Sequence, residues 1–452
     1  MRENCYSKRR LDISYMGKMT ANQEHNYSIS PIWQPFTQMK TAAPPLKVIR
    51  GKGSVLELAD GRQILDCISS WWVTVHGHSH PVLAEALYEQ AQNLEHVIFA
   101  GFTHEPALKL ANKLLTHTPA SLTRIFFSDN GSTAVEVALK MAFQYWRNLG
   151  ETNRTSFISF EGGYHGDTVG AMSAGRSSLW WESFAPLMFA GDVVPFPATF
   201  DGDEEVESKE AASLEKLEFL LKQGGCAGIF IEPLVQGAGG MRMCRPEFLQ
   251  DLAQLARQFN VLLIYDEVMT GFGRTGELFA SVKSATKPDI LCLSKGLSGG
   301  CLPIAVTMAS EDIYQAFWRD ESDKAFFHGH SYTGNPLACA VSVASLELLE
   351  QNPNVYQGME KLHRQYLNQW LRNHPKLERI RTCGTIAAMD VKTESVSGYF
   401  NDIAPVLKAR FLEAGFLLRP LGNTLYLMPP YCISPDELES IYRVIRQVLD
   451  TL

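Results

Sequence analysis

Two apolar runs, VLLIYDE (residues 261–267) and ILCLSKG (residues 290–296), decide the fold predicted for this chain. Neither alternates between apolar and polar residues, which is typical of strands buried on both faces of a parallel sheet. Similar runs recur with helical patterns between them, the strands at residues 124–127, 157–160 and 228–231 and the helices at 134–146 and 246–259. This alternation predicts an α/β fold whose mostly parallel sheet is flanked by helices.

Polar residues stand where these strands end, at Asp129, Glu232, Asp266 and Lys295. Ligands of open α/β sheets bind beyond the carboxyl ends of the strands, so these side chains are the first candidates for a functional site. We expect Asp266 and Lys295, which end successive strands, to point into one cleft. A lysine that forms a Schiff base needs a lowered pKa, and an electron-withdrawing pyridine ring needs a carboxylate at its nitrogen. An ion pair is the alternative interpretation, and spacing alone does not separate the two.

The segment DNGSTA (residues 129–134) follows a strand and opens a helix. Free backbone N–H groups and the helix dipole favour an anion at such a place, so a phosphate would fit beside Gly131 and Ser132. The alternative is an ordinary helix cap formed by a Ser or Thr side chain. A phosphate cradle, an aspartate and a lysine together are what pyridoxal phosphate requires.

Two other motifs are less informative. The segment GFGRTG (residues 271–276) has the spacing of a dinucleotide fingerprint, but the chain before residue 290 is too short for a crossover helix. We therefore reject a dehydrogenase. The histidine clusters at residues 76–80 and 328–330 lack acidic or cysteine neighbours at ligand spacing, so we predict loop histidines and no metal.

Composition excludes several classes of protein. With 45% hydrophobic and 20% charged residues, the chain has the balance of a folded globular protein rather than a disordered one. Its net charge of −8 disfavours binding to nucleic acid or to an anionic membrane surface. Nine cysteines without any C-x-x-C pair indicate reduced core thiols, and no apolar run is long enough for a membrane span. We expect a cytoplasmic protein.

The pattern along the chain predicts two domains and a leader. Residues 1–30 carry basic and acidic residues without a continuous apolar stretch, which is typical of a loose leader. Short strands and helices after the long helix near residue 350 predict a smaller α+β domain, with which the N-terminal segment packs. The predicted parts are a leader (1–30), an N-terminal segment (31–70), a large domain (71–350) and a small domain (351–452).

The chain resembles the class III, fold-type I pyridoxal-phosphate aminotransferases from Trp33 to its C-terminus. The general signal lies in SDNGS (128–132), DEVMTGFGRTG (266–276) and SKG (294–296). A narrower signal lies in SSWW (69–72), GYHGDT (163–168), QGAGGM (236–241), RP (419–420) and YLMPPY (426–431). These motifs are long and cover nearly the whole chain, so chance similarity is a poor explanation.

The resemblance implies a role for individual residues. Lys295 would anchor the cofactor as a Schiff base, and Asp266 would pair with its ring nitrogen. Gly131 and Ser132 would hold its phosphate, while Tyr164 would stack on its ring.

The substrate pocket would combine residues from both subunits of a homodimer. Trp71 and Tyr164 would line it, and Arg419 would receive a substrate carboxylate. His330 and Ser331 would contact the cofactor, with Ser331 reaching the phosphate from the neighbouring subunit, and Gly329 would lie at the subunit boundary. Asp167 and Arg274 also match positions that shape this pocket.

The narrower motifs are similar to those of family members that aminate 8-amino-7-oxononanoate to 7,8-diaminononanoate in biotin biosynthesis. The resemblance implies the same ping-pong reaction here, with S-adenosylmethionine as amino donor. Two departures stand out: Phe36 replaces a usual tyrosine near the reacting atoms, and His330-Ser331 replaces a more usual Pro-Thr. Lysine as donor, another ω-amino acid or diamine aminotransferase, and a catalytically silent protein of the same fold therefore remain alternatives.

Overall fold

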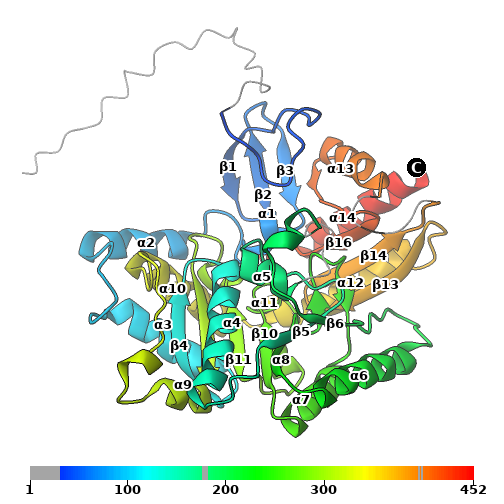
Figure 1. Cartoon of the computed structure of the whole chain (residues 1–452). Helices are drawn as coiled ribbons and strands as arrows, with labels where there is room; N and C mark the ends of the chain where they lie inside the picture. The colour runs from blue at the N-terminus through cyan, green and yellow to red at the C-terminus, as the bar shows by residue number, and fades with distance from the viewer. Residues whose placement is uncertain (1–30, 176–181, 395–397, 399–400) are drawn as a thin grey trace, which may run out of the picture. The chain divides into compact units, whose positions relative to one another are not determined.

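The computed structural model describes residues 31–175, 182–394, 398 and 401–452 (Figure 1). The predicted leader, residues 1–30, lies outside the described residues. The chain divides into two compact units, one ending at Val48 and the other spanning Ile49–Leu452. In the first unit, Phe36 has a φ of 50° and a turn follows in which the amides of Thr41 and Ala42 donate to the carbonyl of Gln38.

A seven-stranded sheet forms the centre of this unit, in the order β4-β12-β11-β10-β7-β5-β6. All of its strands are parallel except β12, which runs antiparallel to both neighbours. The bounds are β4 (Leu122–Ser128), β5 (Ser156–Phe160), β6 (Asp192–Val194), β7 (Cys226–Ile231), β10 (Leu262–Asp266), β11 (Ile290–Leu293) and β12 (Ala305–Ser310). The predicted α/β class and the five predicted strands are confirmed.

Helices cover both faces of the sheet, as the unbroken apolar strands require (Figure 1). Every residue of β10 is buried, but alternate side chains enter different cores. Ile264 packs in the core that contains α4 (Gly131–Asn148), whereas Leu263 and Tyr265 pack in the one that contains α7 (Pro246–Gln258). Because strand side chains alternate between faces, both faces must be apolar. Each buried aliphatic side chain contributes about 1.5–3 kcal/mol.

Most of the elements outside the large sheet are helices. Only α8 (Ala280–Lys283) separates the GFGRTG segment from β11, consistent with rejecting the dinucleotide motif. The remaining helices are α2 (Pro81–Asn93), α3 (Glu105–His117), α5 (Val169–Ala174), α6 (Val206–Lys222), α9 (Glu311–Phe317), α10 (Pro336–Gln351), α11 (Asn354–Gln357), α12 (Met359–Tyr366), α13 (Ile403–Glu413) and α14 (Pro435–Asp450). Within the described parts of the chain, every helix is too short or too polar to cross a bilayer.

Smaller sheets join distant parts of the sequence. A three-stranded antiparallel sheet contains β13 (Leu377–Cys383), β14 (Ile386–Val391) and β16 (Thr424–Leu427). A four-stranded sheet has the order β1-β2-β3-β15, with β1 (Val48–Lys52), β2 (Val55–Leu58), β3 (Gln63–Asp66) and β15 (Phe416–Leu417). Because β15 pairs with β3, a strand from the end of the chain completes a sheet from its beginning. The boundaries proposed at residues 70 and 350 stay predictions.

Candidate active site

Asp266 and Lys295 end neighbouring parallel strands, β10 and β11. Lys295 has a φ of 43°, and its Nζ lies 4.9 Å from the centroid of the Trp72 ring. Burial lowers the pKa of Lys295, although the charges of Asp266 and Glu232 act in the opposite direction. The structure therefore brings the two predicted residues into one electrostatic environment, in which the neutral amine is more populated than in water.

The carboxylate of Asp266 is almost inaccessible, with 4% of the residue exposed, and two donors hold it. The Nδ1 atom of His165 lies 2.8 Å from Oδ2, and the amide of Val268 donates to Oδ1 at 3.0 Å. Burial opposes protonation of His165, but the hydrogen bond to Asp266 and the charge of that carboxylate outweigh it and raise the pKa of the imidazole. His165 thus helps to hold the carboxylate of Asp266 in place. His165 lies in the GYHGDT motif that was recognised from the sequence, but its contact with Asp266 was not predicted.

The N-terminus of α4 offers free donors beside this pair. Asn130 caps the helix in a reciprocal arrangement with Thr133, so the capping role does not fall to Ser132. The amides of Gly131 and Ser132 belong to the first turn, where no intrahelical acceptor exists. The hydroxyl of Ser132 accepts from the amide of Asp167 at 3.2 Å, which leaves its own proton free to donate. An anion would meet three converging donors here.

Close packing fixes the distance between this helix terminus and Asp266. A Cβ atom on Gly131 would lie 2.6 Å from Cγ1 of Val268, and one on Gly166 would lie 2.1 Å from Oγ of Ser132. Gly166 also has a φ of 126°, which disfavours other residues. Both glycines therefore permit backbone approaches that a side chain would prevent.

Tyr164 is held at both ends. Its amide donates to Oε1 of Glu232 at 2.9 Å, and its hydroxyl donates to Oδ2 of Asp167 at 2.9 Å. Burial and the neighbouring Asp167 charge raise the pKa of Tyr164, so the phenol stays protonated. Burial also raises the pKa of Glu232 to about 7, although the amide of Gly237 donates to its other oxygen.

The tryptophans of α1 (Ser69–Trp72) face two cations from other segments. The guanidinium carbon of Arg419 lies 4.6 Å from the centroid of the Trp71 ring, and Trp71 is 43% exposed. The Nε1 of Trp72 donates to the hydroxyl of Tyr426 at 2.9 Å. Arg274 is buried and donates to the carbonyl of Trp72, so it helps to hold the C-terminal end of α1 in place. The contact between Trp72 and Lys295 was missed, because only the neighbouring Trp71 was assigned to the pocket.

The remaining predicted residues lie away from these groups or cannot be placed. The Nδ1 of His330 lies 3.0 Å from Oδ2 of Asp129, while Gly329 and Ser331 are exposed. The site roles of these three residues stay predictions, as does that of Phe36, which belongs to the other unit. Among the described residues, no cluster of His, Cys, Asp and Glu is arranged to hold a metal.

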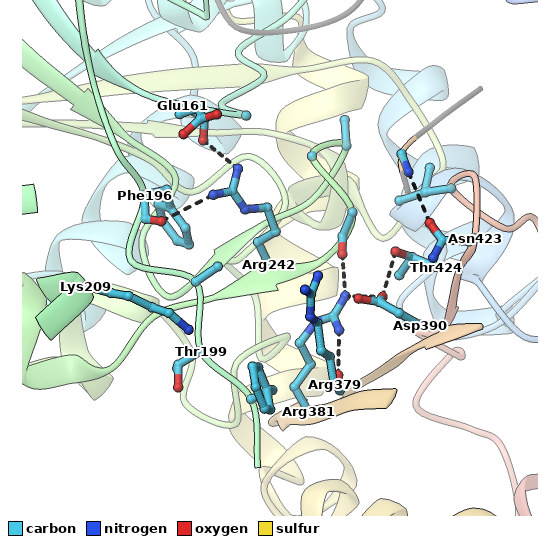
Figure 2. Close-up of a pocket in the computed structure, with 18 of the residues that line it drawn as sticks. Glu161, Phe196, Thr199, Lys209, Arg242, Arg379, Arg381, Asp390, Asn423 and Thr424 are labelled. Atoms are coloured by element: carbon cyan, nitrogen blue, oxygen red, sulfur yellow. Dashed lines mark hydrogen bonds and ion pairs between the residues drawn. The ribbon is translucent and has the colours of Figure 1, made fainter. Parts of the chain in front are cut away.

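A cavity with a volume of about 870 Å³ adjoins the site at Tyr164 (Figure 2). Neither Asp266 nor Lys295 lines it. Its guanidinium groups are largely occupied: Arg242 donates to the carbonyls of Glu161 and Phe196, and Arg381 pairs with Asp390 at 3.0 Å. Side chains of both charges line the cavity. The cations are Lys209, Arg242, Arg379 and Arg381, and the acidic residues are Glu161, Glu205 and Asp390. Arg381 and Asp390 link β13 to β14, and Arg242 holds the segments that follow β5 and β6.

Comparisons with known proteins agree with this geometry. Residues 37–449 match the family described as aminotransferase class-III. The adenosylmethionine-8-amino-7-oxononanoate aminotransferase of Synechococcus elongatus is 54% identical over 421 residues, which cover 93% of this chain and 99% of that protein. The crystal structure of the enzyme of that name from Methanocaldococcus jannaschii has a TM-score of 0.85 at 34% identity, covering 93% and 97% of the two chains.

A second solved structure broadens the comparison within the same fold. An amine transaminase from an uncultivated Pseudomonas species, in a pyridoxal-phosphate-bound form, has a TM-score of 0.84 at 29% identity and covers 93% of this chain and 98% of its own. The family match and the 54% identical relative show that the chain belongs to the class III aminotransferases.

Proposed function

We propose that this chain transfers an amino group from S-adenosylmethionine to 8-amino-7-oxononanoate, with pyridoxal phosphate as cofactor. The product, 7,8-diaminononanoate, belongs to biotin biosynthesis. The 54% identical relative is named for these two substrates, which supports the proposal. The observation that carries it is the placement of Asp266 and Lys295 at or just after the ends of neighbouring parallel strands, together with the N-terminus of α4.

The residues present fit this cofactor. A phosphate needs convergent donors, and the amides of Gly131 and Ser132 with the Ser132 hydroxyl supply them. A pyridine nitrogen needs a carboxylate beside it, and His165 and Val268 hold the carboxylate of Asp266 in a fixed orientation. An anchoring lysine needs a lowered pKa, which burial gives Lys295. When bound, pyridoxal phosphate supplies an electron sink that stabilises negative charge on the substrate's reacting carbon.

Residues of this chain would each have a separate role in the reaction. Lys295 would hold the cofactor, and its neutral Nζ would accept a proton from the reacting carbon of the amino donor and deliver the same proton to the cofactor. Asp266 keeps the ring nitrogen protonated, while His165 orients that carboxylate. Trp72 covers Lys295 at 4.9 Å and limits the access of water. Tyr164 lies between Glu232 and Asp167, where its ring can stack on the cofactor.

Arg419 is proposed to read the carboxylate of 8-amino-7-oxononanoate. A guanidinium fork matches a carboxylate bidentately, and the Trp71 ring 4.6 Å away orients that fork. The apolar chain of the acceptor suits the aromatic wall beside it. This feature favours a carboxylate-bearing acceptor over the simple amines and diamines of other class III enzymes.

We expect Arg419→Ala to raise the KM for the acceptor by roughly 10- to 100-fold, because the substrate carboxylate loses a charge-assisted pair of hydrogen bonds. Steady-state kinetics with the acceptor varied would measure this. Arg419→Lys should restore little, since an ammonium lacks the fork. If the parent enzyme uses an acceptor analogue without the carboxylate as well as the acid, Arg419 has another role.

The amino donor gives a separate prediction. In a single half-reaction followed by cofactor absorbance, S-adenosylmethionine should convert the enzyme efficiently and lysine should not. A hydroxyl is absent at Phe36; its loss costs about 1 kcal/mol if a buried partner is left unsatisfied. Phe36→Tyr should then improve use of S-adenosylmethionine. Conversion by lysine alone would overturn the donor assignment and leave the cofactor and acceptor chemistry intact.

We also propose that the enzyme is a cytoplasmic homodimer. Gly329 and Ser331 are exposed in the single chain, so a second copy could use them. In such a dimer Ser331 would reach the phosphate of the neighbouring site, and His330 would contact the cofactor there.

A further inference from the structure

We propose that Asp66 is a positioning residue: its buried carboxylate holds α1 in a strained shape that keeps Trp71 on Arg419, and thereby sets recognition of the acceptor carboxylate. The inference rests on the proposed function and extends it to a residue that contacts neither substrate nor cofactor.

The backbone of α1 is strained. Ser69, Ser70 and Trp72 have φ values of 51°, 59° and 68°, although none of them is glycine. L-residues rarely adopt this region, and they persist in it only where surrounding contacts determine the conformation. Without such contacts the turn would relax and redirect the ring of Trp71. Something must therefore hold it.

Asp66 supplies the contacts. It ends β3 and is fully buried, with 0% of the residue exposed. Its Oδ1 accepts from the amides of Ile68 at 3.2 Å and Ser70 at 2.9 Å. Its Oδ2 accepts from the Ser70 hydroxyl at 2.9 Å and lies 2.9 Å from Nε2 of His78. The carboxylate of Asp66 thus holds the backbone at Ile68 and Ser70 and also the side chain of Ser70.

His78 connects the carboxylate of Asp66 to the segment that follows β1 of the four-stranded sheet. Its backbone exchanges hydrogen bonds with Gly53, at 2.7 Å and 3.1 Å. A Cβ atom on Gly51 would lie 2.7 Å from the His78 Cβ, so the glycine allows this close approach. Because an ionised carboxylate only accepts, the contact assigns the proton to Nε2 of His78.

The far side of the turn is held by the C-terminal strand region. The Ser69 hydroxyl donates to the carbonyl of Met428 at 2.8 Å, and Trp72 donates to Tyr426. These bonds hold Ser69 and Trp72, whereas among the described residues Ser70 is held by its two hydrogen bonds to Asp66. Asp66 is thus the group whose loss frees the middle of the turn, where Trp71 begins.

The test is Asp66→Asn in the holoenzyme. The amide keeps the volume and one acceptor oxygen, but its NH₂ group cannot accept from Ser70 or His78. We expect the KM for 8-amino-7-oxononanoate to rise on the order of tenfold, since bonds to a charged acceptor are lost. The S-adenosylmethionine half-reaction should stay within about threefold of the parent rate, because Lys295 and Asp266 are untouched.

Two comparisons separate positioning from general stability. With an acceptor analogue lacking the carboxylate, Asp66→Asn and the parent should perform alike, whereas a merely structural defect would affect both acceptors. Asp289→Asn is the matched control: its Oδ2 accepts from the Leu263 amide at 2.8 Å before β11, and its loss should not change the acceptor KM.

Ser70→Ala removes one bond to Asp66 and should give a smaller effect in the same direction, which keeps the test open if Asp66→Asn does not fold. Equal losses with both acceptors, or a donor half-reaction that falls in step, would overturn the positioning role. If the parent enzyme does not aminate 8-amino-7-oxononanoate but does aminate a different acceptor, the proposed function is wrong. That outcome differs from the two results that would overturn the positioning role of Asp66, because it is seen in the parent and not in a variant.

Discussion

Lys295→Ala should abolish amino transfer and covalent attachment of the cofactor together while leaving the fold intact. In the proposed mechanism the amine is both the anchor and the group that moves the proton, and general acid–base catalysis alone contributes about 10²–10⁴-fold. Its Nζ lies 4.9 Å from the centroid of the Trp72 ring and the residue is partly exposed, so truncation should leave no large internal void. We expect turnover to fall by at least about 10³-fold and the melting temperature to change little.

Borohydride reduction of the parent, followed by peptide mapping, measures the attachment directly and should place the pyridoxyl group on Lys295. Lys295→Arg is the matched control: it keeps a cation near Asp266 but never becomes a neutral amine, so it should be as inactive as the alanine variant. A label on any other lysine would end this assignment.

Asp266→Asn should remove most turnover, about 10²-fold or more, because a neutral amide cannot keep a pyridine nitrogen protonated. The substitution preserves shape, and an amide oxygen can still accept from Val268 or His165. Folding and phosphate binding should therefore survive, which circular dichroism and cofactor titration would show.

The Asp289→Asn variant again serves as the control, since it also exchanges a carboxylate that accepts from a backbone amide for an amide. It should keep near-parent activity. Near-parent turnover in Asp266→Asn would instead contradict the role given to that carboxylate, even with Lys295 correctly assigned.

Much of the sheet was predictable because strands buried on both faces leave continuous apolar runs, as at residues 261–265 and 290–293. The antiparallel β12 left a weaker signal, because residue types do not encode strand direction. Chain length does carry that information: fewer than a dozen residues separate β11 from β12, too few for a parallel crossover. The short connection could have indicated the reversal.

The candidate site was predictable where function follows strand ends, as for Asp266 and Lys295. His165 was not assigned a role, because its partner lies 101 residues away and only the fold brings them together. Asp66 gave no signal at all: a single aspartate after a short strand resembles many turn residues. Its significance depends on the positive φ values that follow it, which composition does not reveal.

The pairing of β3 with β15 has a consequence for how the protein is made. Ser69 and its acceptor Met428 are separated by 359 residues, so the ribosome synthesises nearly the whole chain before this contact can form. Until then β3 has an unpaired edge, and the segment carrying Trp71 and Trp72 lacks half of its supports. Such non-local closure is slow and exposes the nascent chain to aggregation. The last strands to leave the ribosome are thus the ones that complete the active site, which ties catalytic competence to a full-length chain.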